Sequence, residues 1–215
     1  GSRKTEYRTH RIDTAAIQDM VREAVARLRN SPPDPEYVPP ADGGQIYRTV
    51  DAWDESTGGI DPGPRMDAAA SAVSAAEAAG AEAAGISRMD SSRRALATST
   101  GNLCFHEATA GIFQLTVLAG SGASYRATVS KARSATPVRR VVDEVVAEAL
   151  SARNPADSQP GEIDVVLEPQ AVADLVSFVL YSLNARESDE GLTVFTGREG
   201  SRVASERFTL ESDMN

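Results

Sequence analysis

The feature that most constrains the fold is a run of strand-like segments between residues 82 and 129, separated by turn residues. The segments combine apolar and β-branched residues in the short lengths typical of strands. Thr100-Gly101-Asn102 and Gly120-Ser121-Gly122 are turn sequences. Successive strands joined by short turns pair antiparallel, so the sequence predicts a meandering antiparallel sheet. The predicted strands are Glu82–Met89, Ala95–Ser99, Leu103–Thr109, Ile112–Leu118 and Ser124–Val129.

Helical patterns lie before and after these strands. Apolar residues recur there at three- and four-residue spacing, which places them on one face of a helix. Asp13 or Thr14 suits the N-cap of the first helix, and Gly80 suits the end of the second. An antiparallel sheet with amphipathic helices predicts an α+β fold. The predicted helices cover 13–29, 65–79, 137–152 and 169–185.

Two stretches lack helix and strand patterns. Residues 31–64 contain proline and glycine throughout, and we expect them to form a strap pinned to the surface rather than a functional loop. Residues 154–161 are predicted as a linker. The linker divides the chain into an α+β domain over 1–153 and the start of a second α/β domain over 162–215. The second domain is expected to open with a strand at 163–167, and its tail to form short strands near 192–195 and 207–210.

Composition excludes several classes of function. Apolar residues make up 41% of the chain, enough for a folded core. The net charge of −9 disfavours binding to nucleic acid or to anionic membranes through a basic patch. Cys104 is the only cysteine, so no disulfide can form within the chain, which fits a reducing compartment such as the cytoplasm. No apolar run reaches the roughly 20 residues of a membrane span.

His106-Glu107 is the one sign of a metal motif. Such a pair opens zinc-protease motifs, where a second histidine one turn later completes the ligands. Ala110 and Gly111 stand at the two possible second positions, and the segment is predicted as a strand instead of the required helix. His10 is the only other histidine. From the residues alone we therefore expect no catalytic, cofactor-binding or metal site.

Cys104 leaves an alternative open. It lies two residues before His106 and would share its strand face, as a nucleophile and its base would need. A cysteine in a strand is more often a small buried apolar residue. An independent enzyme that uses Cys104 and His106 therefore stays a lesser possibility.

Residues 160–175, with the sequence PGEIDVVLEPQAVADL, resemble the start of the C-terminal domain of the TldD/TldE (PmbA) metalloprotease family. Other pieces of the chain are similar to landmarks of that family in the same order. They are Ser99–Asn102, Thr109, Ser121–Ala123, Gly197–Arg202 and Phe208–Leu210. The resemblance runs from about residue 13 to the end of the chain.

The resemblance also shows a departure from the catalytic pattern. The catalytic half of the family carries a His-Glu-x-x-x-His zinc motif on the helix after this strand. By the resemblance, Pro169 stands at the first histidine, Gln170 at the glutamate and Asp174 at the second histidine. Proline has no ligand atom, and glutamine is not a usable base. The chain therefore looks like the non-catalytic TldE (PmbA) half, with no cofactor of its own.

The resemblance implies a partner and a substrate class. A TldE-like subunit pairs with a TldD-like subunit that carries the zinc, and the heterodimer cleaves extended or unfolded peptides, including precursors in peptide maturation. Family members extend beyond both ends of this sequence, so we expect a segment of a longer protein. A module that binds peptides without a protease partner is the alternative from another class.

Overall fold

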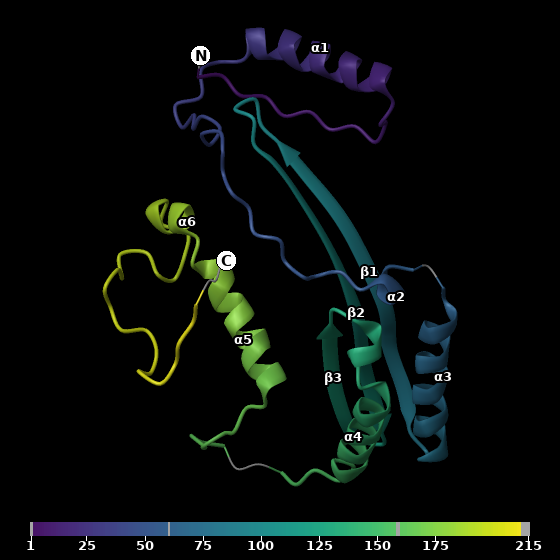
Figure 1. The fold of residues 1–215 in the computed structure, drawn as a ribbon. Coiled ribbons are helices and arrows are strands. Elements are labelled where there is room, and N and C mark those ends of the chain that lie inside the picture. The colour runs from purple at the N-terminus through teal and green to yellow at the C-terminus, as the bar shows by residue number, and fades with distance from the viewer. Residues whose placement is uncertain (1, 60, 158–159, 212–215) are drawn as a thin grey trace. The chain divides into compact units, whose positions relative to one another are not determined.

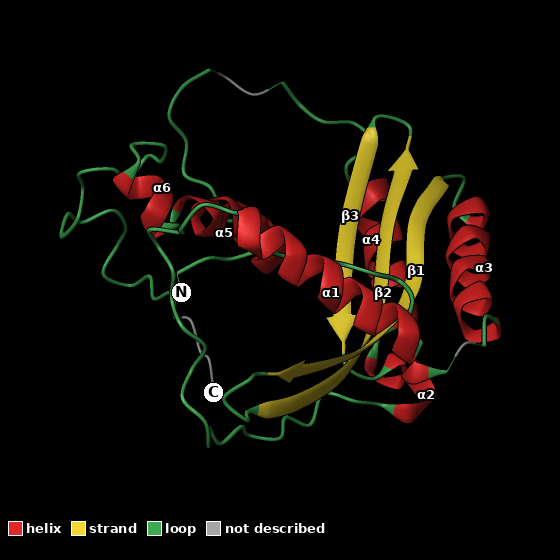
Figure 2. Cartoon of the chain, turned by 90° about the horizontal axis from the view of Figure 1, so that it is seen from above, coloured by secondary structure: helices red, strands yellow, loops and turns green. Residues whose placement is uncertain are grey.

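Three long strands form an antiparallel sheet in the order β1-β2-β3 (Figures 1 and 2). The computed structural model describes residues 2–59, 61–157 and 160–211. The strands are β1 (Glu82–Ala97), β2 (Leu103–Ala119) and β3 (Gly122–Ser130). The pairing of β2 with β3 runs from Gly111 opposite Ser130 to Ala119 opposite Gly122. The predicted antiparallel sheet and the α+β class are confirmed.

The predicted strand breaks at 90–94 and 110–111 are wrong, because five predicted strands merge into three. The polar run from Asp90 to Arg94 continues β1, since a strand that is exposed there tolerates polar side chains. Gly111 continues β2 and has a packing role instead of a turn role. A Cβ atom at Gly111 would lie 3.2 Å from the Cα of Arg133, so glycine permits a close approach of two backbones.

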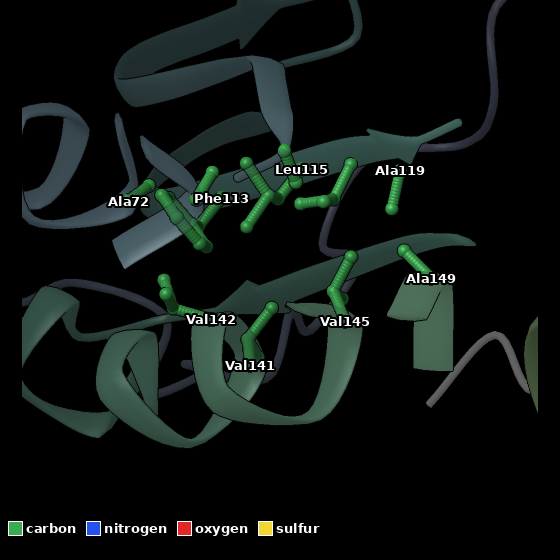
Figure 3. Packing of buried hydrophobic residues seen from close by; sticks show 11 residues of the cluster. Ala72, Phe113, Leu115, Ala119, Val141, Val142, Val145 and Ala149 are labelled. Carbon is green, nitrogen blue, oxygen red and sulfur yellow. The ribbon is translucent and has the colours of Figure 1, made fainter. Parts of the chain in front are cut away.

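The core lies between the sheet and two helices, α3 (Gly63–Ala78) and α4 (Val138–Ser151). Phe113, Leu115 and Val117 alternate along β2 and are buried in this core. Figure 3 shows Phe113 and Leu115 pointing into it. α4 contributes valines, and α3 contributes small alanines that let the helix approach closely. The buried cluster consists of Ala72, Ala76, Ala81, Phe113, Leu115, Val117, Ala119, Val141, Val142, Val145 and Ala149.

Local signals set the ends of these elements. Gly80 follows α3 with φ +67, the left-handed conformation that glycine adopts without strain. Gly120, with φ +63, opens the two-residue turn between β2 and β3. The short helix α2 (Glu55–Gly58) interrupts the irregular stretch before α3, and Asp54 caps it. A single turn of 3-10 helix, η1 (Arg133–Ala135), precedes α4.

The chain divides into two compact units, and the first comprises Gly1–Tyr47 and Ala95–Phe105. It contains α1 (Thr14–Asn30). The N-cap of this helix is Asp13, one of the two residues predicted for that position. In the same unit the buried Asn102 holds the turn between β1 and β2 against the loop at 41–45. Its Nδ2 donates to the Asp42 carbonyl at 2.9 Å, and its Oδ1 accepts from the Gln45 amide at 3.0 Å.

The second unit comprises Arg48–Arg94 and His106–Asn215. The predicted boundary at 154–161 does not coincide with either unit border and stays a prediction. Its residues 158–159 lie outside the described residues. None of the helices in the described ranges is long and apolar enough to cross a membrane.

The last described part of the chain contains α5 (Pro169–Ser182) and α6 (Ala185–Asp189). The predicted helix 169–185 is α5, which ends three residues earlier, at Ser182. Asn184 then caps the separate helix α6. The predicted strands at 163–167, 192–195 and 207–210 are wrong, since the structure has no strand there. Their apolar pattern is present, but a strand also needs a neighbour to pair with. Val165 is 66% exposed and Val194 is 70% exposed.

We expect the Val117→Ala substitution to lower the free energy of unfolding by about 2–3 kcal/mol, because it removes two fully buried methyl groups and leaves a cavity. Val129→Ala is the matched control, since Val129 also lies in the sheet but is 69% exposed. The control should change the free energy of unfolding by less than about 0.5 kcal/mol. Urea unfolding followed by circular dichroism measures both. Equal effects would contradict the assigned core.

Limited proteolysis should cut first within 31–64 or 154–161, because proteases need extended, exposed backbone. Mass spectrometry of the earliest fragments identifies the sites. A first cut inside α4 or α5 would contradict both the linker and the helix assignments.

Candidate functional site

The beginning of α5 carries the three motif positions. Pro169 is the first residue of the helix, where its missing amide donor costs nothing. The Gln170 side-chain amide donates to an Asp174 carboxylate oxygen one turn later, at 3.0 Å. The motif positions therefore hold a proline ring and an amide that is hydrogen-bonded to a carboxylate. None of them has an imidazole.

The segment that leads into α5 contacts β3 through a charge cluster centred on Arg126. The Arg126 guanidinium lies 3.5 Å from a carboxylate oxygen of Glu168, the N-cap residue of α5. It also pairs with Glu148, and its Nε lies 3.6 Å from Glu144. Ser124 donates to the second Glu148 oxygen at 2.6 Å. One arginine on β3 thus contacts two acidic residues of α4 and one at the start of α5.

These contacts fix the charges of the cluster. Burial lowers the pKa of Arg126, but the hydrogen bond and charge of Glu148, with Glu168 and Glu144, outweigh burial and raise it above the ordinary arginine value. The hydrogen bond from the Ser124 hydroxyl, with the hydrogen bond and charge of Arg126, holds the pKa of Glu148 below its ordinary value against the effect of burial. Arginine and glutamate are both charged at neutral pH. The cluster is therefore suited to positioning the start of α5 and not to proton transfer.

A cleft of about 380 Å³ opens beside the cluster. It lies among β3, the first half of α4 and the first turn of α5, so Pro169, Gln170 and Ala173 line it. Arg126 and Glu144 supply charge to its wall. No histidine, cysteine or serine belongs to its described lining. Its described lining therefore has no imidazole or thiol to act as base or nucleophile, and no group of side chains that could hold a metal ion.

The other predicted residues of chemical interest are apart from this cleft. Cys104 and His106 lie near the beginning of β2, the first half-buried and the second exposed. Within the described ranges, neither side chain has a hydrogen-bond partner that could orient it. Glu107 pairs with Arg93 at 3.0 Å. Among the described residues, no three His, Cys, Asp or Glu side chains are grouped closely enough to hold a metal ion.

The irregular stretch before α3 is pinned to the sheet at Thr109. The Thr109 amide donates to the Ala52 carbonyl at 2.9 Å, and its hydroxyl accepts from the Asp54 amide at 2.9 Å. The same hydroxyl donates to the Lys131 carbonyl at 3.0 Å. The Thr57 hydroxyl is the main cause of the lowered pKa of Asp54. The stretch is thus a strap, and Thr109 fastens its part around residues 52–54.

Sequence reasoning missed Arg126 and its partners. The signal was present, because Ser124 and Arg126 share one side of the predicted strand. Glu144 and Glu148 lie four residues apart and so share one face of the predicted helix. The sequence gives no indication that these two surfaces pack together.

Two comparisons with known proteins return a match. Residues 160–214 match the family model of the PmbA/TldA metallopeptidase C-terminal domain. The chain is also similar to the crystal structure of TldE from Thermococcus kodakarensis, with a TM-score of 0.75 and 19% sequence identity. That likeness covers 86% of this chain and 44% of that chain, so this sequence spans less than half of its relative's length. At such an identity it shows a shared fold. No curated protein matches the chain.

We expect the purified chain to hold no zinc after dialysis, because a protein zinc site needs three or four ligands and the motif positions are Pro169, Gln170 and Asp174. Elemental analysis of the dialysed protein measures the metal content. One tightly bound zinc per chain would contradict this prediction.

Proposed function

Because residues 160–214 match the PmbA/TldA metallopeptidase C-terminal domain, we propose that the chain is a segment of the non-catalytic, TldE/PmbA-like half of the TldD/TldE family. In this proposal it completes a zinc metalloprotease heterodimer whose TldD-like subunit carries the metal. The complex cleaves extended or unfolded peptides in peptide maturation. The single cysteine supports a reducing compartment, so we place the complex in the cytoplasm.

The observation that carries the proposal is the chemistry at the start of α5. Metal-assisted peptide hydrolysis needs a metal-bound water and a general base beside it. Pro169 offers no ligand atom, and the Gln170 amide is engaged with Asp174 at 3.0 Å. A subunit with these residues can support a partner's chemistry, but it cannot perform that chemistry through this motif.

The sheet supports a role in holding peptide. β1 and β3 are its edge strands, and the pairing of β3 with β2 begins only at Gly111, so residues 103–110 of β2 lie beyond the reach of β3. Edge amides and carbonyls can pair with an extended chain whatever its sequence. Strand addition would let this subunit shape a channel for unfolded substrates.

The alternatives have less support. A standalone peptide-binding module would use the same edges, and it differs only in having no protease partner. An independent enzyme would need Cys104 and His106 to act together, yet neither has an orienting partner within the described ranges. The Cys104→Ser substitution separates this last case, because it would abolish an activity that depends on the thiol.

We expect the chain alone to leave an unstructured peptide intact, because no metal-bound water is available to attack the amide. The full-length protein mixed with a zinc-bearing TldD-like subunit should cleave the peptide, and a chelator should stop the reaction. Chromatography of the peptide over time measures both. Chelator-sensitive cleavage by this chain alone would overturn the proposal.

A control variant tests the role of the motif positions. Pro169→His, Gln170→Glu and Asp174→His together restore the motif but supply only two histidine ligands, and a two-ligand site binds zinc weakly. The triple variant of this chain should therefore stay inactive on the same peptide. If it became active, the site would contain a further ligand among its own residues.

A further inference from the structure

A second and larger cleft, of about 830 Å³, lies on the helix-covered face of the sheet. It is bounded by the first half of α3, the middle of β1 and β2, and the segment from η1 into α4. Phe113 and Met89 contribute apolar surface. The volume falls within the range typical of binding sites. The cleft shares Pro137 and Arg140 with the smaller cleft at α5 but contains none of the motif positions.

Arginine is the commonest charged residue in the lining of this cleft. Four arginines and two aspartates line it, and three of the arginines pair with acidic residues. Arg88 pairs with Asp90 at 2.8 Å, and Arg140 pairs with Glu144 at 2.7 Å. Arg139 lies 4.0 Å from Asp143. The lining arginines are Arg88, Arg133, Arg139 and Arg140.

Arg133 differs from the other three arginines. It is half-buried, and within the described residues its guanidinium has no carboxylate or hydrogen-bond acceptor. Its backbone is fixed, because its amide donates to the buried Thr57 hydroxyl at 2.8 Å and its Cα packs closely over Gly111. A partly desolvated guanidinium without an anion leaves strong donors unused. It therefore favours a negatively charged ligand.

The neighbouring strand indicates the kind of ligand. Residues 87–89 of the edge strand β1 line the cleft, so an extended chain could pair with the edge while its side chains enter the cleft. Apolar surface next to an arginine suits a peptide in which an acidic residue lies among apolar ones.

From these observations we propose that the cleft at Arg133 binds an extended peptide through an aspartate or glutamate side chain, with the carboxylate on the Arg133 guanidinium. The inference rests on the proposed function in that the bound peptide would be a substrate of the complex. It adds a preference for acidic residues that the motif positions do not explain.

The test is peptide binding by the chain alone, followed by fluorescence anisotropy with an uncharged dye. One peptide alternates valine and threonine around a central aspartate, and the other has asparagine there; both have blocked termini. The aspartate peptide should bind about tenfold more tightly, as a charge-assisted hydrogen bond in a partly buried site provides. Arg133→Gln should remove this difference, and circular dichroism should show an unchanged fold.

Two variants separate the cleft from general electrostatics. Arg94→Gln removes the same charge from an exposed position outside the cleft, and it should leave the preference for aspartate intact. Asp67→Asn removes an acidic group from the cleft and should strengthen binding of the aspartate peptide. If Arg133→Gln does not fold, the Asp67→Asn result still decides the proposal.

Three outcomes would overturn the inference. The first is equal affinity for the two peptides. The second is that Arg133→Gln and Arg94→Gln change the preference for aspartate equally. The third is binding of inorganic phosphate without binding of either peptide. None of them touches the proposed function, because that function is tested by cleavage in the mixture with a zinc-bearing partner. Loss of that cleavage, with the aspartate preference intact, would instead sink the proposed function alone.

Discussion

The alternation of side chains along β2 is the constraint on which the rest of the structure depends. Phe113, Leu115 and Val117 point to one side, and each is 3% exposed or less. A shift of one residue in the pairing with β3 would move all three to the opposite face, so burial fixes the register. That register places Arg126 opposite Leu115 on the helix-facing side, where it meets the acidic face of α4. The charge cluster at α5 therefore depends on the core.

Much of this arrangement could be predicted from the sequence, because its causes are local. The glycine turns, the N-cap Asp13 and the alternation in 112–118 predict the hairpin of β2 and β3, the start of α1 and the end of α3. The strand predictions that are wrong lie where a neighbouring strand decides whether a segment becomes a strand. The polar run at 90–94 joins a strand because β2 lies beside it, and the apolar stretch at 163–167 has no described strand beside it. The periodicity of apolar residues is a property of one segment, whereas strand formation also requires a second strand to pair with.

The same distinction applies to the candidate sites. Pro169, Gln170 and Asp174 could be singled out because a motif is contiguous in sequence. The Arg126 cluster joins β3, α4 and the start of α5, and the cleft at Arg133 joins four elements. Such sites exist only after the chain has folded. The lack of an acidic partner for Arg133 within the described residues is likewise a property of the packing, since acidic residues are abundant in the sequence.

The two clefts differ in the groups that line them. At the start of α5, Pro169 and the hydrogen-bonded Gln170 and Asp174 stand at the motif positions. Glu168 at the N-cap contacts Arg126 on β3. The contact that positions the start of α5 is thus present, while the motif positions hold no histidine and no glutamate. The cleft at Arg133 does not include the motif positions. The proposed selection of a peptide by its charge therefore does not depend on which residues occupy the motif positions.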